Sequence, residues 1–95
     1  MKETVEKIKV PKNKEIIGVV IEPLGASRFK VSCQDGHERI CRIPGRLKRR
    51  FWVKNEDLVL VEPWETDEKE RGDIIWKYTK TQVNWLKRKG YLKNI

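Results

Sequence analysis

The sequence predicts an all-β fold, a five-stranded OB-type barrel with one helix at its C-terminal end. Five short segments have the patterning of strands, an irregular basic insertion follows the third of them, and the last segment carries helix start and stop signals. An OB-type barrel has this order of elements, and an SH3-like barrel is the main alternative. With 95 residues, the chain forms one domain near the lower limit for a self-sufficient core.

Three parts of the chain are distinguished by composition. Residues 1–13 mix Lys and Glu with scattered apolar residues and are interpreted as a flexible, mildly basic arm. Residues 14–80 are expected to form the barrel. Residues 81–95 are expected to form the closing helix and a short tail that pack on the barrel.

The first two strands are predicted at residues 15–22 and 27–34. The first is a β-branched run in which Gly18 predicts a bulge or sharp bend, a device that lets a small barrel curl. The second alternates strictly, so that Phe29 falls on the inner face and Lys30 on a polar, basic outer face. The outer face of the second strand is therefore expected to contribute to a positive surface.

A tight turn is predicted at Asp35-Gly36, followed by a returning strand at residues 37–43. Two loop lengths are compatible with this turn. The alternation of the returning strand is expected to point Cys41 into the barrel, which favours a three-residue loop with a glycine bulge over a two-residue loop. Arg42, the next residue along this strand, is then expected to point outward.

The second half of the chain begins with an insertion, residues 44–54, that is predicted to contain a helical turn around residues 47–50. Strands are predicted at residues 57–62 and 73–79. The acid-rich loop between them is interpreted as a solubilising loop, which keeps RNA to one side of the barrel or meets a basic partner.

The closing helix is predicted to begin at an N-cap provided by Thr81, with Val83 and Leu86 facing inward. Gly90 is expected to follow the C-cap, and the basic residues just before it are explained by the negative end of the helix dipole. These cations are therefore not needed to explain ligand binding.

No catalytic, metal or cofactor site is predicted, and the chain is not expected to be an enzyme. Neither hairpin register brings Cys33 opposite Cys41, so both are expected to be reduced thiols. Two Cys and the single His37 are too few for a structural zinc site. A mean hydropathy of −0.71, no long apolar run and no signal-like N-terminus predict a cytoplasmic protein without a membrane partner.

The segment from Arg39 to Lys54, RICRIPGRLKRRFWVK, is the strongest functional signal. It contains seven Lys and Arg residues and no acid, and so supplies most of the chain's net charge of +8. Such crowded like charges repel unless an anionic partner neutralises them, which indicates nucleic-acid binding rather than an ordinary solvated loop. Trp52 is the candidate platform for a stacked base, although a core tryptophan that anchors the loop is the equal alternative. Phe51 is then expected to hold the loop to the barrel.

The order of these motifs resembles the translation initiation factor 1A family, the archaeal and eukaryotic counterpart of the smallest bacterial initiation factor. The resemblance covers residues 15–91. It rests on the Asp35-Gly36 hairpin, the strand R-I-C-R-I, the stretch G-R-L-K-R-R with Trp52-Val53 after it, and the strand D-L-V-L-V at residues 57–61.

This resemblance implies an S1-like OB fold that binds the small ribosomal subunit near the decoding A site, contacts rRNA and aids engagement of initiator tRNA and mRNA. Other initiation factors are candidate partners, and a monomer is expected. Eukaryotic members carry a long acidic C-terminal tail, whereas this chain stops at Ile95, which predicts an archaeal-type factor. Together with the outer-face lysine, the predicted RNA-binding residues are Lys30, Arg39, Arg42, Arg46, Lys48, Arg49, Arg50, Trp52 and Lys77.

Two other functions remain as alternatives. A general single-stranded RNA chaperone of the cold-shock type would present several aromatic side chains on the second and third strands, where Phe29 is instead patterned inward. A protein-interaction barrel would use the basic loop to bind an acidic peptide and would bind RNA weakly.

Overall fold

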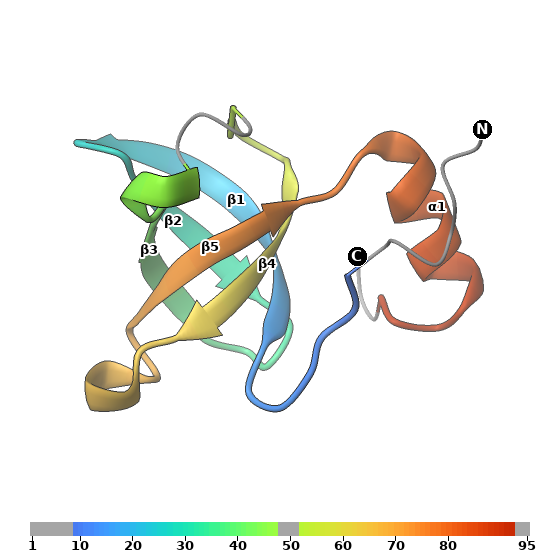
Figure 1. The fold of residues 1–95 in the computed structure, drawn as a ribbon, viewed down its shortest axis with the longest axis horizontal. Helices are drawn as coiled ribbons and strands as arrows, with labels where there is room; N and C mark the ends of the chain where they lie inside the picture. The colour runs from blue at the N-terminus through green and yellow to red at the C-terminus, as the bar shows by residue number, and fades with distance from the viewer. Residues whose placement is uncertain (1–8, 48–51, 93–95) are drawn as a thin grey trace.

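A computed structural model describes residues 9–47 and 52–92, and these residues form a closed barrel with a helix beside it (Figure 1). The strand order around the barrel is β1-β2-β3-β5-β4, in which only β3 and β5 pair in parallel. This architecture confirms the predicted five-stranded barrel with a C-terminal helix. The strands are β1 (Ile16–Gly25), β2 (Arg28–Cys33), β3 (Glu38–Arg42), β4 (Leu58–Pro63) and β5 (Arg71–Lys77).

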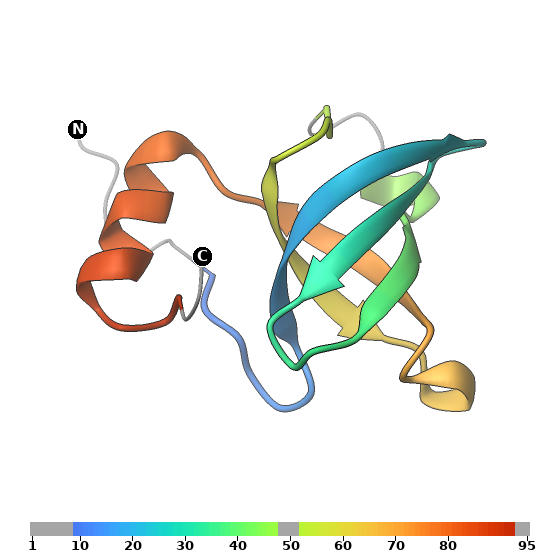
Figure 2. The same cartoon turned by 180° about the vertical axis from the view of Figure 1, so that it is seen from behind.

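Two short 3-10 turns and one α-helix complete the described part. The turn η2 (Gly45–Leu47) follows β3, and η3 (Glu65–Asp67) lies in the acid-rich loop between β4 and β5. The helix α1 (Lys80–Arg88) follows β5 and lies to one side of the barrel (Figure 2). The helical turn expected around residues 47–50 lies mostly outside the described residues, and the described turn begins earlier, at Gly45.

The strand β1 closes the barrel because it pairs with both β2 and β4. Its register shifts lie between Val20 and Glu22 and again between Pro23 and Gly25, so the predicted bulge does not lie at Gly18. Gly18 marks a close approach of backbones instead. A Cβ at this position would lie 2.6 Å from Val31 Cγ1, and glycine is therefore required by packing.

The β2–β3 hairpin has the predicted three-residue loop with a glycine bulge. The Cys33 amide donates to the His37 carbonyl at 3.0 Å, and Gly36 has a φ of 91°, which a side chain rarely adopts. This register buries Cys41 and turns Arg42 outward, as predicted.

Two apolar clusters stabilise the fold. The barrel interior contains the first, in which β-branched residues from the strands surround Cys33 and Cys41. Both cysteines are free and buried, and burial raises the pKa of Cys33 and raises the pKa of Cys41 to about 12. The second cluster joins α1 to the barrel and consists of Ile17, Leu58, Leu60, Tyr78 and Leu86.

The helix α1 begins two residues before its predicted start. Thr79 is the N-cap and forms a capping box with Gln82, in which each side chain accepts from the other residue's backbone amide. The C-terminal end is as predicted, because Gly90 has a φ of 81° and the Tyr91 amide reaches back to the Leu86 carbonyl at 3.0 Å.

The first described residues of the N-terminal segment contact the second cluster. Val10 packs against it, and the Tyr78 hydroxyl donates to the Lys9 carbonyl. In the described ranges, no helix has the length and apolar character needed to cross a membrane.

Candidate nucleic-acid interface

Trp52 has an anchored backbone and an exposed ring. Its side chain is 89% exposed, while its carbonyl accepts a hydrogen bond from Lys77 Nζ at 2.6 Å. An exposed tryptophan is not explained by core packing, since burying such a ring stabilises a protein strongly. Of the two alternatives for Trp52, the structure therefore disfavours the core anchor and leaves the ring available to a ligand.

Asp57 fixes the end of the loop that carries Trp52. Its carboxylate accepts from the Lys54 amide at 2.8 Å and lies 3.2 Å from Lys54 Nζ. The same carboxylate lies 3.4 Å from Lys77 Nζ, which joins the loop to β5. Lys77, a predicted RNA-binding residue, is thus engaged in holding the loop, and its side chain is only 25% exposed.

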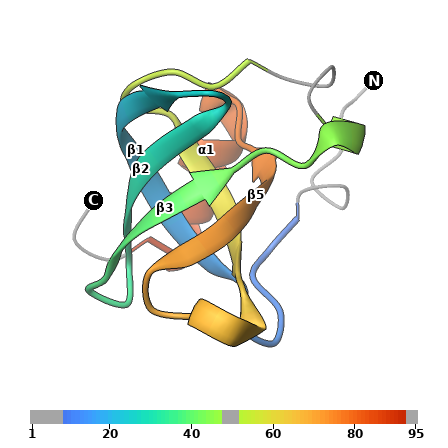
Figure 3. The same ribbon diagram turned by 90° about the vertical axis from the view of Figure 1, so that its left-hand side faces the viewer.

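The outer faces of β2 and β3 carry three exposed or half-buried cations. Arg28 lies directly opposite Arg42, and Lys30 lies opposite Ile40 on the same face. Arg46 extends the cationic surface into η2, which projects from the barrel beside β3 and β5 (Figure 3). Within residues 9–47 and 52–92, Arg28, Lys30 and Arg46 form no ion pair, so their charges are available to an anion.

Arg42 lies over the ring of Trp64, a residue that the sequence did not mark as functional. Its guanidinium carbon lies 5.2 Å from the centre of the Trp64 ring, and its Nε lies 3.7 Å from Asp73 Oδ1. Trp64 Nε1 donates to the same Asp73 oxygen at 2.9 Å. Trp64 was missed because it stands in the acid-rich loop, and only the parallel pairing of β3 with β5 brings this loop next to Arg42.

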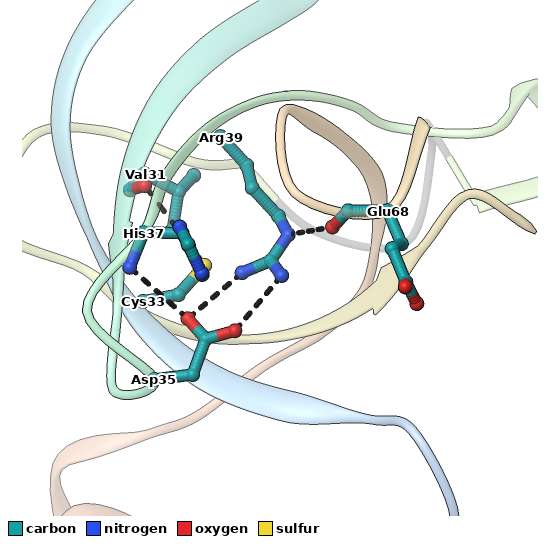
Figure 4. Close-up of polar contacts among 6 residues, drawn as sticks. All are labelled: Val31, Cys33, Asp35, His37, Arg39 and Glu68. Atoms are coloured by element: carbon teal, nitrogen blue, oxygen red, sulfur yellow. Dashed lines mark hydrogen bonds and ion pairs between the residues drawn. The ribbon is translucent and has the colours of Figure 1, made fainter. Parts of the chain in front are cut away.

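Arg39 lies apart from this exposed surface. Its side chain is 3% exposed and forms two hydrogen bonds with the Asp35 carboxylate, at 2.9 and 3.0 Å. Its Nε also donates to the Glu68 carbonyl at 2.6 Å, which ties the hairpin to the β4–β5 loop (Figure 4). The bonds to Asp35 raise the pKa of Arg39, and its charge is already compensated within the protein.

Lys30, Arg42, Arg46 and Trp52 are thus exposed or half-exposed residues of β2, β3 and the segment that follows them. Lys48, Arg49, Arg50 and Phe51 lie outside the described residues, so their predicted roles stay predictions. In the described part of the chain, no group of three or more His, Cys, Asp or Glu residues is arranged to hold a metal ion.

Comparison with known proteins places these features in a family context. A family model described as translation initiation factor 1A / IF-1 matches residues 5–95. Translation initiation factor 1A of Methanothermobacter thermautotrophicus is 51% identical over 89 residues, which cover 94% of this chain and 90% of the relative. The corresponding protein of Methanococcus aeolicus is 57% identical over 81 residues, covering 85% of this chain and 77% of the relative.

Solved structures share the barrel. Translation initiation factor IF-1 from the wolbachia endosymbiont of Brugia malayi matches with a TM-score of 0.55 and 32% identity, covering 83% of this chain and 91% of that chain. YjeQ from Thermotoga maritima also has a TM-score of 0.55, but at 19% identity and over 23% of its length, so this likeness concerns the fold alone. The match to the solved initiation factor agrees with the predicted OB-type barrel.

Proposed function

The chain belongs to the translation initiation factor 1A / IF-1 family, and from this we propose that it binds the small ribosomal subunit near the decoding A site through rRNA. In that position it promotes engagement of initiator tRNA and mRNA. Other initiation factors are candidate partners in the same complex.

The observation that carries this proposal is the geometry of Trp52. Its carbonyl is fixed to Lys77, and its neighbours Lys54 and Asp57 are fixed to each other, yet its ring is almost fully exposed. RNA-binding proteins use such rings to stack unpaired bases, and a ring on an anchored backbone loses little entropy on binding.

Cations without an acidic partner also support an RNA ligand. Arg28, Lys30 and Arg46 have no acidic partner in the described ranges, and the sequence places three further cations, Lys48, Arg49 and Arg50, immediately before Phe51 and Trp52. Uncompensated cations and an exposed aromatic ring on the same barrel offer both the phosphate and the base contacts that RNA recognition needs.

The distribution of aromatic residues argues against a general cold-shock type chaperone. Phe29, the aromatic residue of β2, packs against the barrel core rather than on the outer face. The described residues of β3 include no aromatic side chain. An OB barrel that binds any single strand by serial stacking needs several outward rings on these strands.

The proposal is tested by titrating archaeal small ribosomal subunits with three variants over a salt series. Trp52→Ala should weaken binding about fivefold or more with an unchanged salt slope, because it removes stacking and no charge. Arg46→Gln should lower the slope of log K against log salt by about 0.7–0.9, because it removes one phosphate contact.

Arg88→Gln is the matched control, since Arg88 lies at the C-terminal end of α1, to one side of the barrel, and its charge is explained by the helix dipole. It should bind as the wild type does. Equal affinities of the wild type and Trp52→Ala would contradict the role of Trp52, and equal slopes for Arg46→Gln and Arg88→Gln would place the RNA-binding surface elsewhere.

A further inference from the structure

The guanidinium of Arg42 lies over the ring of Trp64, and Arg42 is exposed to solvent. The guanidinium carbon of Arg42 lies 5.2 Å from the centre of the Trp64 ring, and the Arg42 side chain is still 54% exposed. The guanidinium therefore lies beside an aromatic ring, while more than half of the Arg42 side chain remains accessible to a ligand.

Both residues are oriented by Asp73. Trp64 Nε1 donates to Asp73 Oδ1 at 2.9 Å, and Arg42 Nε approaches the same oxygen at 3.7 Å. The backbone of Trp64 is fixed as well, because its amide donates to the Arg71 carbonyl at 3.0 Å and its carbonyl accepts from the Asp67 amide at 3.2 Å. An arginine that is already restrained by such neighbours in the free protein loses less entropy when a ligand stacks on it.

The position of Arg28 is a second, independent indication of a ligand. Arg28 and Arg42 are direct partners in the β2–β3 register, and like charges opposite each other destabilise a sheet. Arg28 has no ion-pair partner within the described ranges. The repulsion between the two arginines is relieved when an anionic ligand lies over this part of the sheet.

We infer that Arg42 and Trp64 form a second site for RNA, in which an unpaired base stacks on the Arg42 guanidinium while Arg28 lies near the adjoining phosphate. This inference rests on the proposed RNA-binding function and adds a contact that is separate from Trp52. Asp73 and Lys77, which anchor the two sites, are four residues apart along β5, roughly 13 Å. Two different nucleotides therefore occupy the two sites.

The surroundings of Trp64 define the kind of base. A surface hollow of about 360 Å³ adjoins the ring and is lined by Glu62, Glu65 and Thr66 as well as Asp73. Carboxylates accept hydrogen bonds from exocyclic amino groups, as they do from cytosine N4. A base that stacks on Arg42 and extends over this hollow is therefore expected to carry an amino group, which uracil lacks.

A phosphate is a poorer occupant of this site than a base. Asp73 already compensates part of the Arg42 charge, and the acidic lining of the hollow repels an anion. A guanidinium plane stacked on a base needs no net charge, since the contact is between two flat surfaces.

The test uses the full chain with two single-stranded probes, oligocytidylate and oligouridylate, and with intact small ribosomal subunits. The probes are about 12 nucleotides long, a length within the site sizes of OB folds. Arg42→Lys keeps the positive charge and removes the planar guanidinium. It should weaken binding of oligocytidylate about fivefold or more without changing the slope of log K against log salt. Arg88→Lys, the same exchange at the end of α1, should bind as the wild type does. The wild type should bind oligocytidylate more tightly than oligouridylate, and Arg42→Lys should reduce this preference.

Trp64→Leu serves as a second variant, because it removes the ring that supports the guanidinium and leaves the Arg42 charge in place. It should reproduce the loss seen with Arg42→Lys, and the double variant should lose little more than either single one. Thermal unfolding gives the transition temperature of each variant. Binding is then measured well below that temperature, so that only folded proteins are compared.

The outcomes separate this inference from the proposed function. Loss of oligocytidylate binding by Arg42→Lys in a protein that fails to bind small subunits would support the stacking site and refute the ribosomal role. Equal binding of oligocytidylate by the wild type and Arg42→Lys would overturn the stacking site. If that equality were accompanied by weaker binding of Arg42→Lys to intact subunits, Arg42 would contribute to subunit binding by a contact other than base stacking, which also overturns the inference.

Discussion

Arg39 and Asp35 form a two-point ion pair in which the arginine is almost completely buried. The distances are 3.0 Å from Nη1 to Oδ1 and 2.9 Å from Nη2 to Oδ2, and the Arg39 side chain is 3% exposed. Because Arg39 Nε also donates to the Glu68 carbonyl, the pair links the tip of the β2–β3 hairpin to the loop between β4 and β5.

Replacing Asp35 with Asn should lower the free energy of unfolding by about 2 kcal/mol, because the buried guanidinium loses charged hydrogen bonds. Chemical denaturation at neutral pH measures this difference. Asp67→Asn is the matched control, since the Asp67–Arg71 pair is exposed on both sides and should cost at most about 0.5 kcal/mol. Equal losses for the two variants would contradict the structural role of the Arg39–Asp35 pair.

The same pair predicts how stability depends on pH. The hydrogen bond from Arg39, followed by that from the His37 amide, lowers the pKa of Asp35 below its ordinary value of 3.8. A lowered pKa in the folded state means that the stabilisation is complete above the ordinary value and is lost as the pH falls through the folded-state value. The stability difference between wild type and Asp35→Asn should therefore shrink as the pH falls below about 4. A difference that stays constant in this range would show that Asp35 titrates normally.

Gly18 is expected to tolerate no side chain. In Gly18→Ala the new Cβ would lie 2.6 Å from Val31 Cγ1 and 3.0 Å from the Ser32 carbonyl oxygen, so we expect a loss of about 1–3 kcal/mol in unfolding free energy. Gly45→Ala is the control, because a Cβ added at Gly45 would have nothing within 4 Å and the φ of Gly45 is not positive. Thermal or denaturant unfolding of both variants checks the prediction, which fails if Gly18→Ala is as stable as Gly45→Ala.

The start of α1 gives a prediction that distinguishes two neighbouring threonines. Thr79→Ala removes the capping box and should cost about 1 kcal/mol. Thr81→Ala changes an exposed position inside the first turn and should be neutral or slightly stabilising, since alanine has the higher helix propensity. Denaturant unfolding compares the two, and a larger cost for Thr81→Ala would restore the N-cap predicted from the sequence.

Local patterning was sufficient to predict most of the barrel. The alternation of Phe29, Val31 and Cys33 and the turn at Asp35-Gly36 identify the β2–β3 hairpin, and the parity of Cys41 sets its register. These features depend on residues close in sequence, whose side chains must alternate between the core and solvent. The same reasoning predicted that Arg42 points outward.

The features that the sequence did not reveal depend on contacts between distant segments. The parity that buries Cys41 also turns Arg39 inward, but a buried arginine is acceptable only because Asp35 and the Glu68 carbonyl meet it there. Trp64 reaches Arg42 only through the parallel pairing of β3 and β5. Parallel pairing of segments so far apart leaves no local signal in either strand.

The measurement that tests the central proposal most directly is co-sedimentation of the protein with purified archaeal small ribosomal subunits, over a salt series and with excess unstructured RNA as competitor. The proposed function predicts saturation at one copy per subunit, which the competitor does not displace and which Trp52→Ala weakens. Binding without saturation, removed in proportion to the competitor's phosphate, would contradict a specific site on the subunit and leave a general RNA-binding barrel.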